Sequence, residues 1–87
     1  MKPHLTPRQK EIIRLVSLGC TNEEAGAILG LSPSTVDNHK TRAMEVLGTN
    51  KAVLLTRLAL KLRLTSMKDK LTAREKRLSG RKKDGWN

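Results

Sequence analysis

Residues 31–48 constrain the fold more than any other stretch, because they carry both the start and the stop signal of one helix. Ser32 is a suitable N-cap, since its hydroxyl can accept a hydrogen bond from a free amide of the first turn. Pro33 suits the first helical position, and Gly48 suits the left-handed position after the last turn. The stretch therefore predicts a helix over residues 33–47, about 22 Å long at 1.5 Å per residue.

This predicted helix separates into two faces. The residues expected to be buried recur at helical spacing: Val36, Ala43, Met44 and Leu47. The residues on the other face are short and polar: Ser34, Asp37, Asn38 and Thr41. Lys40 and Arg42 flank them. Such a face is often no more than a solvated surface, but a helix of this size and chemistry also fits the major groove of DNA.

Two further helices are predicted before it, and each has its own capping box. Thr6 and Gln9 start the first helix, which ends at Gly19. Thr21 and Glu24 start the second helix. Their inward residues are aliphatic: Ile12, Ile13, Leu15, Val16, Leu18, Ala25, Ile28 and Leu29. Gly26 lowers helix propensity by about 1 kcal/mol relative to Ala, so we expect it to permit a close helix crossing.

The second helix ends at Gly30, and a three-residue turn joins it to the helix over residues 33–47. A short helix, a turn carrying Gly and a longer helix with a polar outer face form the layout of a helix-turn-helix. An ordinary helical hairpin has the same loop length. The polar face and the positive charge of the chain favour DNA binding.

The composition narrows the class of protein. The 87 residues have a net charge of +10, and residues 61–87 hold ten Lys and Arg against three Asp and Glu. This balance favours a polyanionic partner, nucleic acid rather than membrane. Without Phe or Tyr the core must be aliphatic, and a single cysteine, Cys20, excludes a disulfide framework or a Cys-rich zinc site. No apolar run is long enough to span a membrane and no leader is evident, so we expect a cytoplasmic protein.

A fourth helix is predicted over residues 50–64, and it is apolar around more than half of its circumference. It holds more leucines than one small core can bury. We expect the surplus to face a second copy of the chain, with Leu54, Leu55 and Leu58 in the interface. The alternative is that the whole helix packs within one four-helix domain.

Several short motifs now combine into a resemblance. They are Leu5-Thr6 with Arg8, residues 19–25, residues 29–32, Thr35-Val36 with His39, and Leu47-Gly48. In order and spacing they resemble the LuxR/FixJ/NarL-type helix-turn-helix domain over residues 5–64. The resemblance implies a four-helix domain of a bacterial transcription regulator. Its third helix would read the major groove, and its fourth would mediate dimerisation.

Site residues follow from the resemblance by position. The base-reading positions fall on Asp37, Asn38 and Thr41. The positions that contact the DNA backbone fall on Thr21, Asn22, Ser34, Thr35, His39 and Lys40. The family usually has Lys where this chain has Asp37. A carboxylate is unfavourable near phosphates unless it accepts from a cytosine amino group, so we expect a different sequence preference. A bulky aliphatic residue is usual at Ala43, so other side chains must fill the core there.

Residues 65–87 lie outside the resemblance and form a basic tail. Ser66 is predicted to cap a short, marginally stable fifth helix carrying Met67, Leu71 and Leu78. Residues 81–87, which include Trp86, are predicted to be a flexible basic end. The predicted fold class is therefore all-α: a four-helix helix-turn-helix bundle, residues 5–64, with a basic C-terminal extension.

The predicted function is sequence-specific binding of double-stranded DNA by a homodimeric transcription regulator, with RNA polymerase as a further partner. One alternative is a region-4-like domain of an RNA polymerase sigma factor, which shares the Leu-Thr-x-Arg start. Another is a protein-interaction module that uses the fourth helix and the basic tail. An enzyme is not expected, because the sequence has no acid pair, metal-ligand spacing or phosphate-binding glycine loop. No cofactor or metal is expected either.

Overall fold

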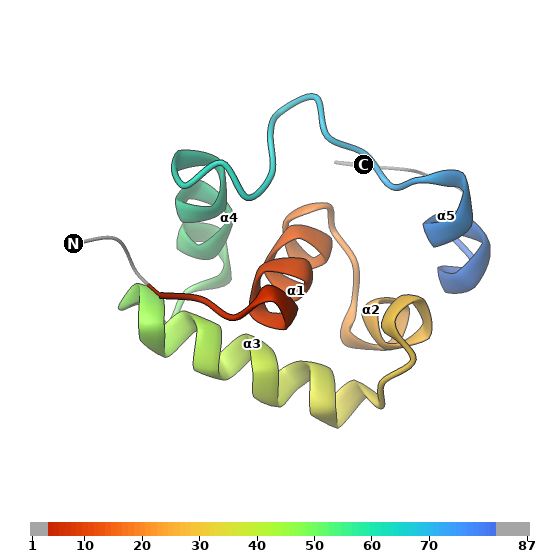
Figure 1. The fold of residues 1–87 in the computed structure, drawn as a ribbon, viewed down its shortest axis with the longest axis horizontal. Coiled ribbons are helices and arrows are strands. Elements are labelled where there is room, and N and C mark those ends of the chain that lie inside the picture. The colour runs from red at the N-terminus through yellow and green to blue at the C-terminus, as the bar shows by residue number, and fades with distance from the viewer. Residues whose placement is uncertain (1–3, 82–87) are drawn as a thin grey trace.

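Five helices make up the part of the chain that the structure describes. The computed structural model describes residues 4–81, except the side chain of Ala52. The helices are α1 (Pro7–Ser17), α2 (Asn22–Leu29), α3 (Pro33–Leu47), α4 (Ala52–Lys61) and α5 (Ala73–Ser79). Figure 1 shows α3 along one side of the molecule, α1 above it between α2 and α4, and α5 beyond α2. The prediction of an all-α fold is confirmed.

Capping boxes start α1 and α2 as predicted. In α1 the Thr6 hydroxyl accepts from the Gln9 amide at 3.1 Å, and the Gln9 side chain accepts from the Thr6 amide at 2.9 Å. The same reciprocal pair joins Thr21 and Glu24 at the start of α2, at 3.1 and 2.9 Å. Each box satisfies two backbone donors that the first turn of a helix leaves unpaired. Because this chemistry is local, the sequence alone was sufficient to place both helix starts.

Both ends of α3 are also where the sequence predicted them. The Ser32 hydroxyl accepts from the Thr35 amide at 3.2 Å, and Pro33 occupies the first helical position. At the other end Gly48 adopts a φ of 71°, the left-handed conformation in which a side chain is strained. The helix α3 is therefore 15 residues long, over the predicted range.

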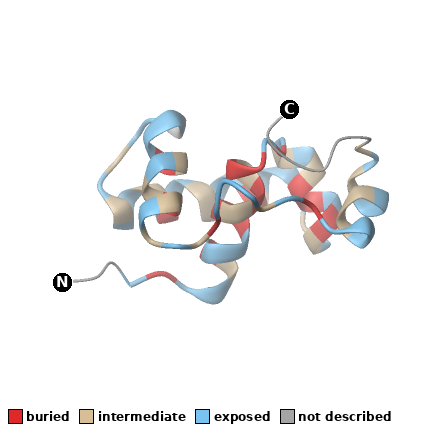
Figure 2. Ribbon diagram, turned by 90° about the horizontal axis from the view of Figure 1, so that it is seen from above, coloured by how far each residue is buried: buried red, intermediate tan, exposed pale blue. Residues whose placement is uncertain are grey.

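Two hydrophobic clusters form the core, and α1 contributes to both. The first joins α1, α2 and α3: Ile12, Leu15, Leu18, Cys20, Ala25, Ile28, Val36 and Leu71. The second joins α1, α3 and α4: Leu5, Ile13, Ala43, Leu55 and Ala59. Figure 2 shows the buried residues inside the molecule, on the sides of the helices that face one another. Leu5, Ile13 and Leu55 pack with Ala43 in this second cluster.

The turn between α2 and α3 depends on Gly26. A Cβ atom at this buried position would overlap the backbone carbonyl oxygen of Leu31. The Leu31 amide in turn donates to the Gly26 carbonyl at 2.9 Å. A close approach at Gly26 is therefore present, but it is to the backbone of the turn and not, as the sequence analysis expected, to another helix. This contact fixes where α3 begins relative to α2.

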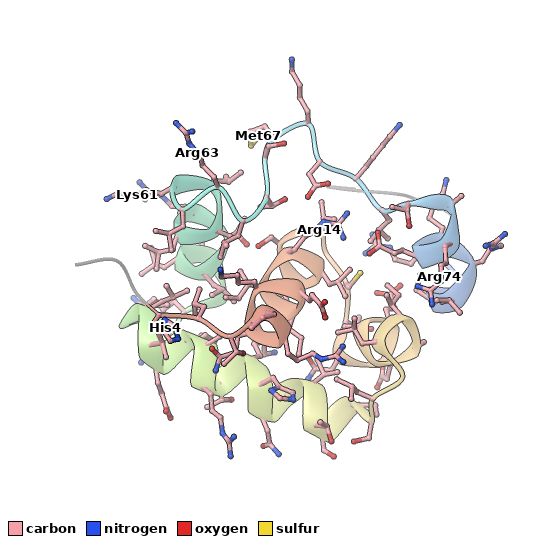
Figure 3. All side chains as sticks on the ribbon, viewed as in Figure 1. His4, Arg14, Lys61, Arg63, Met67 and Arg74 are labelled. Carbon is pink, nitrogen blue, oxygen red and sulfur yellow. The ribbon has the colours of Figure 1, made fainter. Side chains whose placement is uncertain are left out.

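The fourth helix is shorter than predicted. α4 covers Ala52–Lys61 instead of residues 50–64, because the chain turns at Arg63, whose φ is 61°. The Leu64 amide donates back to the Ala59 carbonyl at 2.9 Å, which closes the helix end. Figure 3 shows Lys61 and Arg63 pointing away from the body of the molecule. A non-glycine residue holds a position that usually belongs to glycine, which is why the sequence did not indicate this stop.

The assignment of Leu55 to a dimer interface is wrong. Leu55 is completely enclosed by the core of its own chain, together with Ala43 and Ala59. The apolar residues that α4 leaves at the surface are Leu54, 39% exposed, and Val53, 76% exposed. Only the orientation of α4 against α1 and α3 separates these neighbouring positions into core and surface.

Residues 65–81 return to the helix bundle. The fifth helix begins at Ala73, not near Ser66, because Thr72 and Glu75 form a third capping box at 3.1 and 2.9 Å. Leu71, just before it, is 2% exposed and belongs to the first hydrophobic cluster. We call residues 65–81 the return segment. Its packing against the bundle continues well beyond residue 64, where the resemblance to the family ends.

Ion pairs to Arg14 hold the return segment on α1. The Arg14 guanidinium lies 3.0 Å from an Asp69 oxygen and 2.8 Å from a Glu75 oxygen. Figure 3 shows Arg14 beneath the segment that links α4 to α5. Burial works to raise the pKa of both carboxyls. Hydrogen bonds from Arg14 and Thr65 to Asp69, and from Thr72 and Arg14 to Glu75, outweigh it and lower both pKa values.

A second arginine ties the end of the return segment to α2. Arg81 Nη1 donates to the Leu18 carbonyl at 3.3 Å, and Arg81 Nε lies 3.6 Å from a Glu24 oxygen. The prediction of a flexible end that starts at Arg81 is therefore wrong for Arg81 itself. Residues 82–87, with Trp86, lie outside the described residues. Cys20 lies beside Arg81 and is buried as predicted, and its burial raises the pKa of its thiol.

Candidate nucleic-acid interface

The outer face of α3 exposes the short polar side chains that the sequence singled out. All four are exposed: Ser34, Asp37, Asn38 and Thr41. On the opposite face Val36 and Ala43 have no exposed surface, and Met44 and Leu47 pack partly buried against the core. The helix is therefore held from behind, while its polar face is open to a partner. We call the four exposed residues, Ser34, Asp37, Asn38 and Thr41, the reading face of α3.

The start of α3 carries a small cluster of hydroxyl groups. The Ser32 Oγ lies 3.2 Å from the Ser34 Oγ and 2.8 Å from the Thr35 Oγ1. Each hydroxyl has one donor, and Ser32 can donate to only one of its two neighbours, so one of Ser34 and Thr35 keeps its donor for an incoming oxygen. The free amides of the first helical turn point the same way and carry a partial positive charge. This end of α3 suits a phosphate group.

Three polar side chains meet where α2 begins beside α3. The Asn22 amide nitrogen donates to Asp37 Oδ1 at 3.4 Å. The Lys40 ammonium donates to the Asn22 amide oxygen at 3.4 Å and lies 3.6 Å from Asp37 Oδ1. The sequence proposed each of these residues for DNA contact. It did not indicate that they contact one another, because 15 residues separate Asn22 from Asp37.

The remaining predicted contact residues lie around this cluster. Thr21 is exposed, although its hydroxyl already accepts from the Glu24 amide as the cap of α2. His39 is half-buried on α3, between the reading face and the core. His4 is exposed near the N-terminus and Figure 3 shows it apart from the reading face, as expected for a surface residue.

A second candidate surface lies on α4. A groove of about 540 Å³ separates the end of α3 from the exposed side of α4. Its apolar lining comes from Leu47, Leu54 and Leu58, and the basic residues Arg57 and Lys61 also line it. Val53 adds further exposed apolar surface on the same helix. The sequence analysis did not select Val53 for the interface, although it is the most exposed large apolar residue among those described.

None of the helices in residues 4–81 has the length and apolar character needed to cross a bilayer.

Comparison with known proteins gives a consistent result. A family model described as bacterial regulatory proteins, luxR family, matches residues 3–59. The uncharacterized response regulatory protein YgeK of Escherichia coli K12 is 36% identical over 58 residues, which is 67% of this chain and 40% of that protein. The probable transcriptional regulator ycf29 of Porphyra purpurea is also 36% identical over 58 residues, which is 67% of this chain and 28% of that protein.

The transcriptional regulatory protein UhpA of Escherichia coli K12 is 40% identical over 53 residues, which is 61% of this chain and 27% of that protein. This chain thus spans less than half the length of each of these three relatives. No solved structure gives a significant match. The family model covers α1, α2, α3 and most of α4, the same helices that position the reading face. The chain belongs to the luxR family of bacterial regulatory proteins.

Proposed function

We propose that this chain is the DNA-binding module of a bacterial transcription regulator, and that α3 reads base edges in the major groove of double-stranded DNA. One observation carries the proposal: the reading face is exposed while Val36 and Ala43, on the opposite side of the same helix, are fully enclosed. A helix held in this way presents its polar atoms at fixed positions. Short side chains also lose little conformational entropy on binding.

Roles within the interface follow from the chemistry of each group. We assign base reading to Asp37, Asn38 and Thr41, of which the Asn38 amide matches the donor and acceptor of an adenine edge. We assign contacts with the DNA backbone to groups that donate to phosphate oxygens: Thr21, Asn22, Ser34, Thr35, His39 and Lys40. These groups lie at the start of α2 and along α3. Phosphate contacts would fix the register, and base contacts would supply the specificity.

We further propose that the module, residues 5–64 with the return segment packed on it, acts as a homodimer through α4. Leu54 and Val53 are exposed and Leu58 is half-buried, so α4 presents apolar surface next to the groove formed with Leu47. A contiguous apolar patch of this kind favours an interface. A two-fold dimer would place two reading faces on two half-sites of one operator.

Membership of the luxR family supports a regulator over the two alternatives that the sequence left open, a sigma-factor region and a protein-interaction module. The family is one of regulatory proteins and not of enzymes, in agreement with the sequence prediction.

The test of DNA reading compares two variants of α3. A bound sequence is first selected from random duplexes with the unaltered chain. Asn38→Ala is then expected to lose about 1–3 kcal/mol of binding free energy, and mainly at one base position. Lys40→Ala is expected to weaken binding to every sequence of the panel and to reduce the slope of log K against log salt by about 1. Fluorescence anisotropy on a panel of single-base variants measures both effects.

The control for Lys40→Ala is Lys68→Ala. It removes the same charge from the segment between α4 and α5, which Figure 1 shows on the far side of the molecule from α3. We expect it to leave the salt dependence unchanged. If Asn38→Ala and Lys40→Ala behave identically over the panel, or if Lys68→Ala reproduces the loss, the assigned roles are wrong.

The dimer proposal has its own matched pair of variants. Leu54→Glu places a charge on the exposed side of α4 and is expected to give a folded monomer, measured as a halved mass in sedimentation. Met67→Glu places the same charge on a side chain that is 70% exposed outside α4 and is expected to leave the mass unchanged. An unaltered mass for a folded Leu54→Glu variant would refute an interface at α4.

A further inference from the structure

A carboxylate lies in the middle of the reading face. Asp37 is on the outer side of α3, and its side chain is 54% exposed. The phosphates of DNA repel a negative charge, so a carboxylate at this place opposes binding unless the protein compensates it. Asp37 therefore needs an explanation that is specific to this chain.

The compensation comes from Lys40 and Asn22. Both side chains act on the same oxygen, Oδ1, which lies 3.6 Å from the Lys40 ammonium and 3.4 Å from the Asn22 amide nitrogen. The Asn22 oxygen accepts from Lys40 at 3.4 Å, so the three side chains form a closed ring. These are long and partly exposed contacts, and they stabilise the fold little. Their effect is to neutralise the carboxylate and to fix its orientation.

The second carboxylate oxygen of Asp37, Oδ2, accepts no hydrogen bond from any residue that the structure describes. An ionised carboxylate only accepts, so this oxygen calls for a donor from the partner. In the major groove, amino donors belong to cytosine and adenine. Adenine presents an N7 acceptor next to its amino group, which a carboxylate cannot satisfy. Cytosine presents only its N4 donor on its own edge, so it is the better match.

We propose that Asp37 selects a cytosine in the major groove through Oδ2, and that Lys40 and Asn22 are the positioning residues that make this possible. The proposal rests on the proposed function, since it requires α3 to lie in the major groove. Lys40 has three donors, so it serves Asp37 and Asn22 and still has one for a phosphate oxygen. The chain would thus prefer operators with a cytosine at one defined position of each half-site.

The first experiment compares base preferences. Sequences are selected from random duplexes with the unaltered chain, with Asp37→Asn and with Glu45→Gln. Glu45 is an exposed carboxylate on the same helix beyond the three-residue ring, so it is a matched control. We expect the unaltered chain and Glu45→Gln to prefer cytosine at one position by about 10-fold or more. We expect Asp37→Asn to lose that preference and to keep the preferences at the other positions.

A retained cytosine preference in Asp37→Asn would overturn the inference while leaving DNA reading by α3 intact. A selected motif without a cytosine preference in the unaltered chain would do the same. If the unaltered chain enriches no sequence at all, the proposed function fails, and the inference fails with it. The two failures are therefore distinguishable in one experiment.

A double-mutant cycle tests the role of Lys40. Lys40→Ala is compared in the unaltered chain and in Asp37→Asn, with affinity measured on the selected duplex. If Lys40 positions and neutralises Asp37, its removal should cost at least about 3-fold more affinity when Asp37 is present, because an uncompensated carboxylate then faces the DNA. Equal losses in the two backgrounds would show that Lys40 contacts phosphate only, and the positioning role would be refuted.

Discussion

The reading face of α3 and the return segment both carry many polar and charged side chains, but the molecule uses them in different ways. The polar groups of the reading face are exposed, and their contacts with the rest of the chain are long, between 3.4 and 3.6 Å around Asp37. In the return segment the acidic groups turn inward, and Glu75 lies 2.8 Å from Arg14. One region leaves its polar groups for a partner, and the other uses them to fold.

The acidic and basic side chains of the return segment also lie in different places. Asp69 and Glu75 are engaged by Arg14, while four basic residues are exposed at the surface: Lys68, Lys70, Arg74 and Arg77. A composition that is strongly basic therefore need not indicate a disordered tail or a DNA-binding arm. In this chain the basic segment packs on the bundle through Leu71 and through the contact of Asp69 with Arg14.

The largest effect is expected from removing the apolar anchor of the return segment. Leu71→Ala should lower the free energy of unfolding by about 2–5 kcal/mol, because Leu71 is 2% exposed and packs with the core of α1, α2 and α3. Leu78→Ala is the control, since Leu78 is 41% exposed. Urea unfolding measures both. Equal stability of the two variants would mean that the return segment does not belong to the cooperative fold.

A smaller effect is expected from Arg14→Gln, which removes both ion pairs that Arg14 forms with the return segment. We expect a loss of about 1–3 kcal/mol at neutral pH, between the values for exposed and for buried pairs. Arg8→Gln breaks the exposed pair of Arg8 with Glu11 and should cost no more than about 0.5 kcal/mol. Thermal unfolding of the two variants measures both losses. Equal losses would show that the ion pairs of Arg14 stabilise the fold no more than the exposed pair of Arg8 does.

The same variant has a defined pH dependence. The pKa values of Asp69 and Glu75 are lowered in the folded chain, so their contribution to stability is present above the ordinary carboxyl pKa values of about 4. It is lost as the pH falls through the lowered values. The stabilities of the unaltered chain and of Arg14→Gln should therefore converge in acid. A difference that stays constant down to about pH 2 would exclude these ion pairs as its source.

The smallest effect has the opposite sign. Arg63 ends α4 with a φ of 61°, so Arg63→Gly should raise the free energy of unfolding by about 1 kcal/mol. Gly48→Ala is its mirror control, because Gly48 ends α3 at a φ of 71° with open space where a Cβ would lie. It should lower stability by a similar amount. A destabilising Arg63→Gly would show that the Arg63 side chain contributes more than its backbone strain costs.

The comparison also shows what sequence could and could not predict. The starts of α1, α2 and α3 depend on contacts between the cap and the residue three positions later, as between Thr6 and Gln9, so local patterns were sufficient. The reading face followed from helical spacing for the same reason. The return segment depends on contacts between Arg14 and Asp69, 55 residues apart, which no local pattern reports. Whether Leu54 or Leu55 is buried in the core likewise depends on how α4 crosses α1.

One measurement tests the central claim most directly, that α3 and not the return segment meets DNA. The ¹⁵N-labelled chain is titrated with a duplex selected from random sequences, and amide chemical shifts are followed by NMR. We predict that the amides of residues 34–41 and those at the start of α2 shift most, while the amides of residues 65–81 stay close to their free positions. Large shifts confined to residues 65–81, with the amides of residues 34–41 unmoved, would contradict the claim.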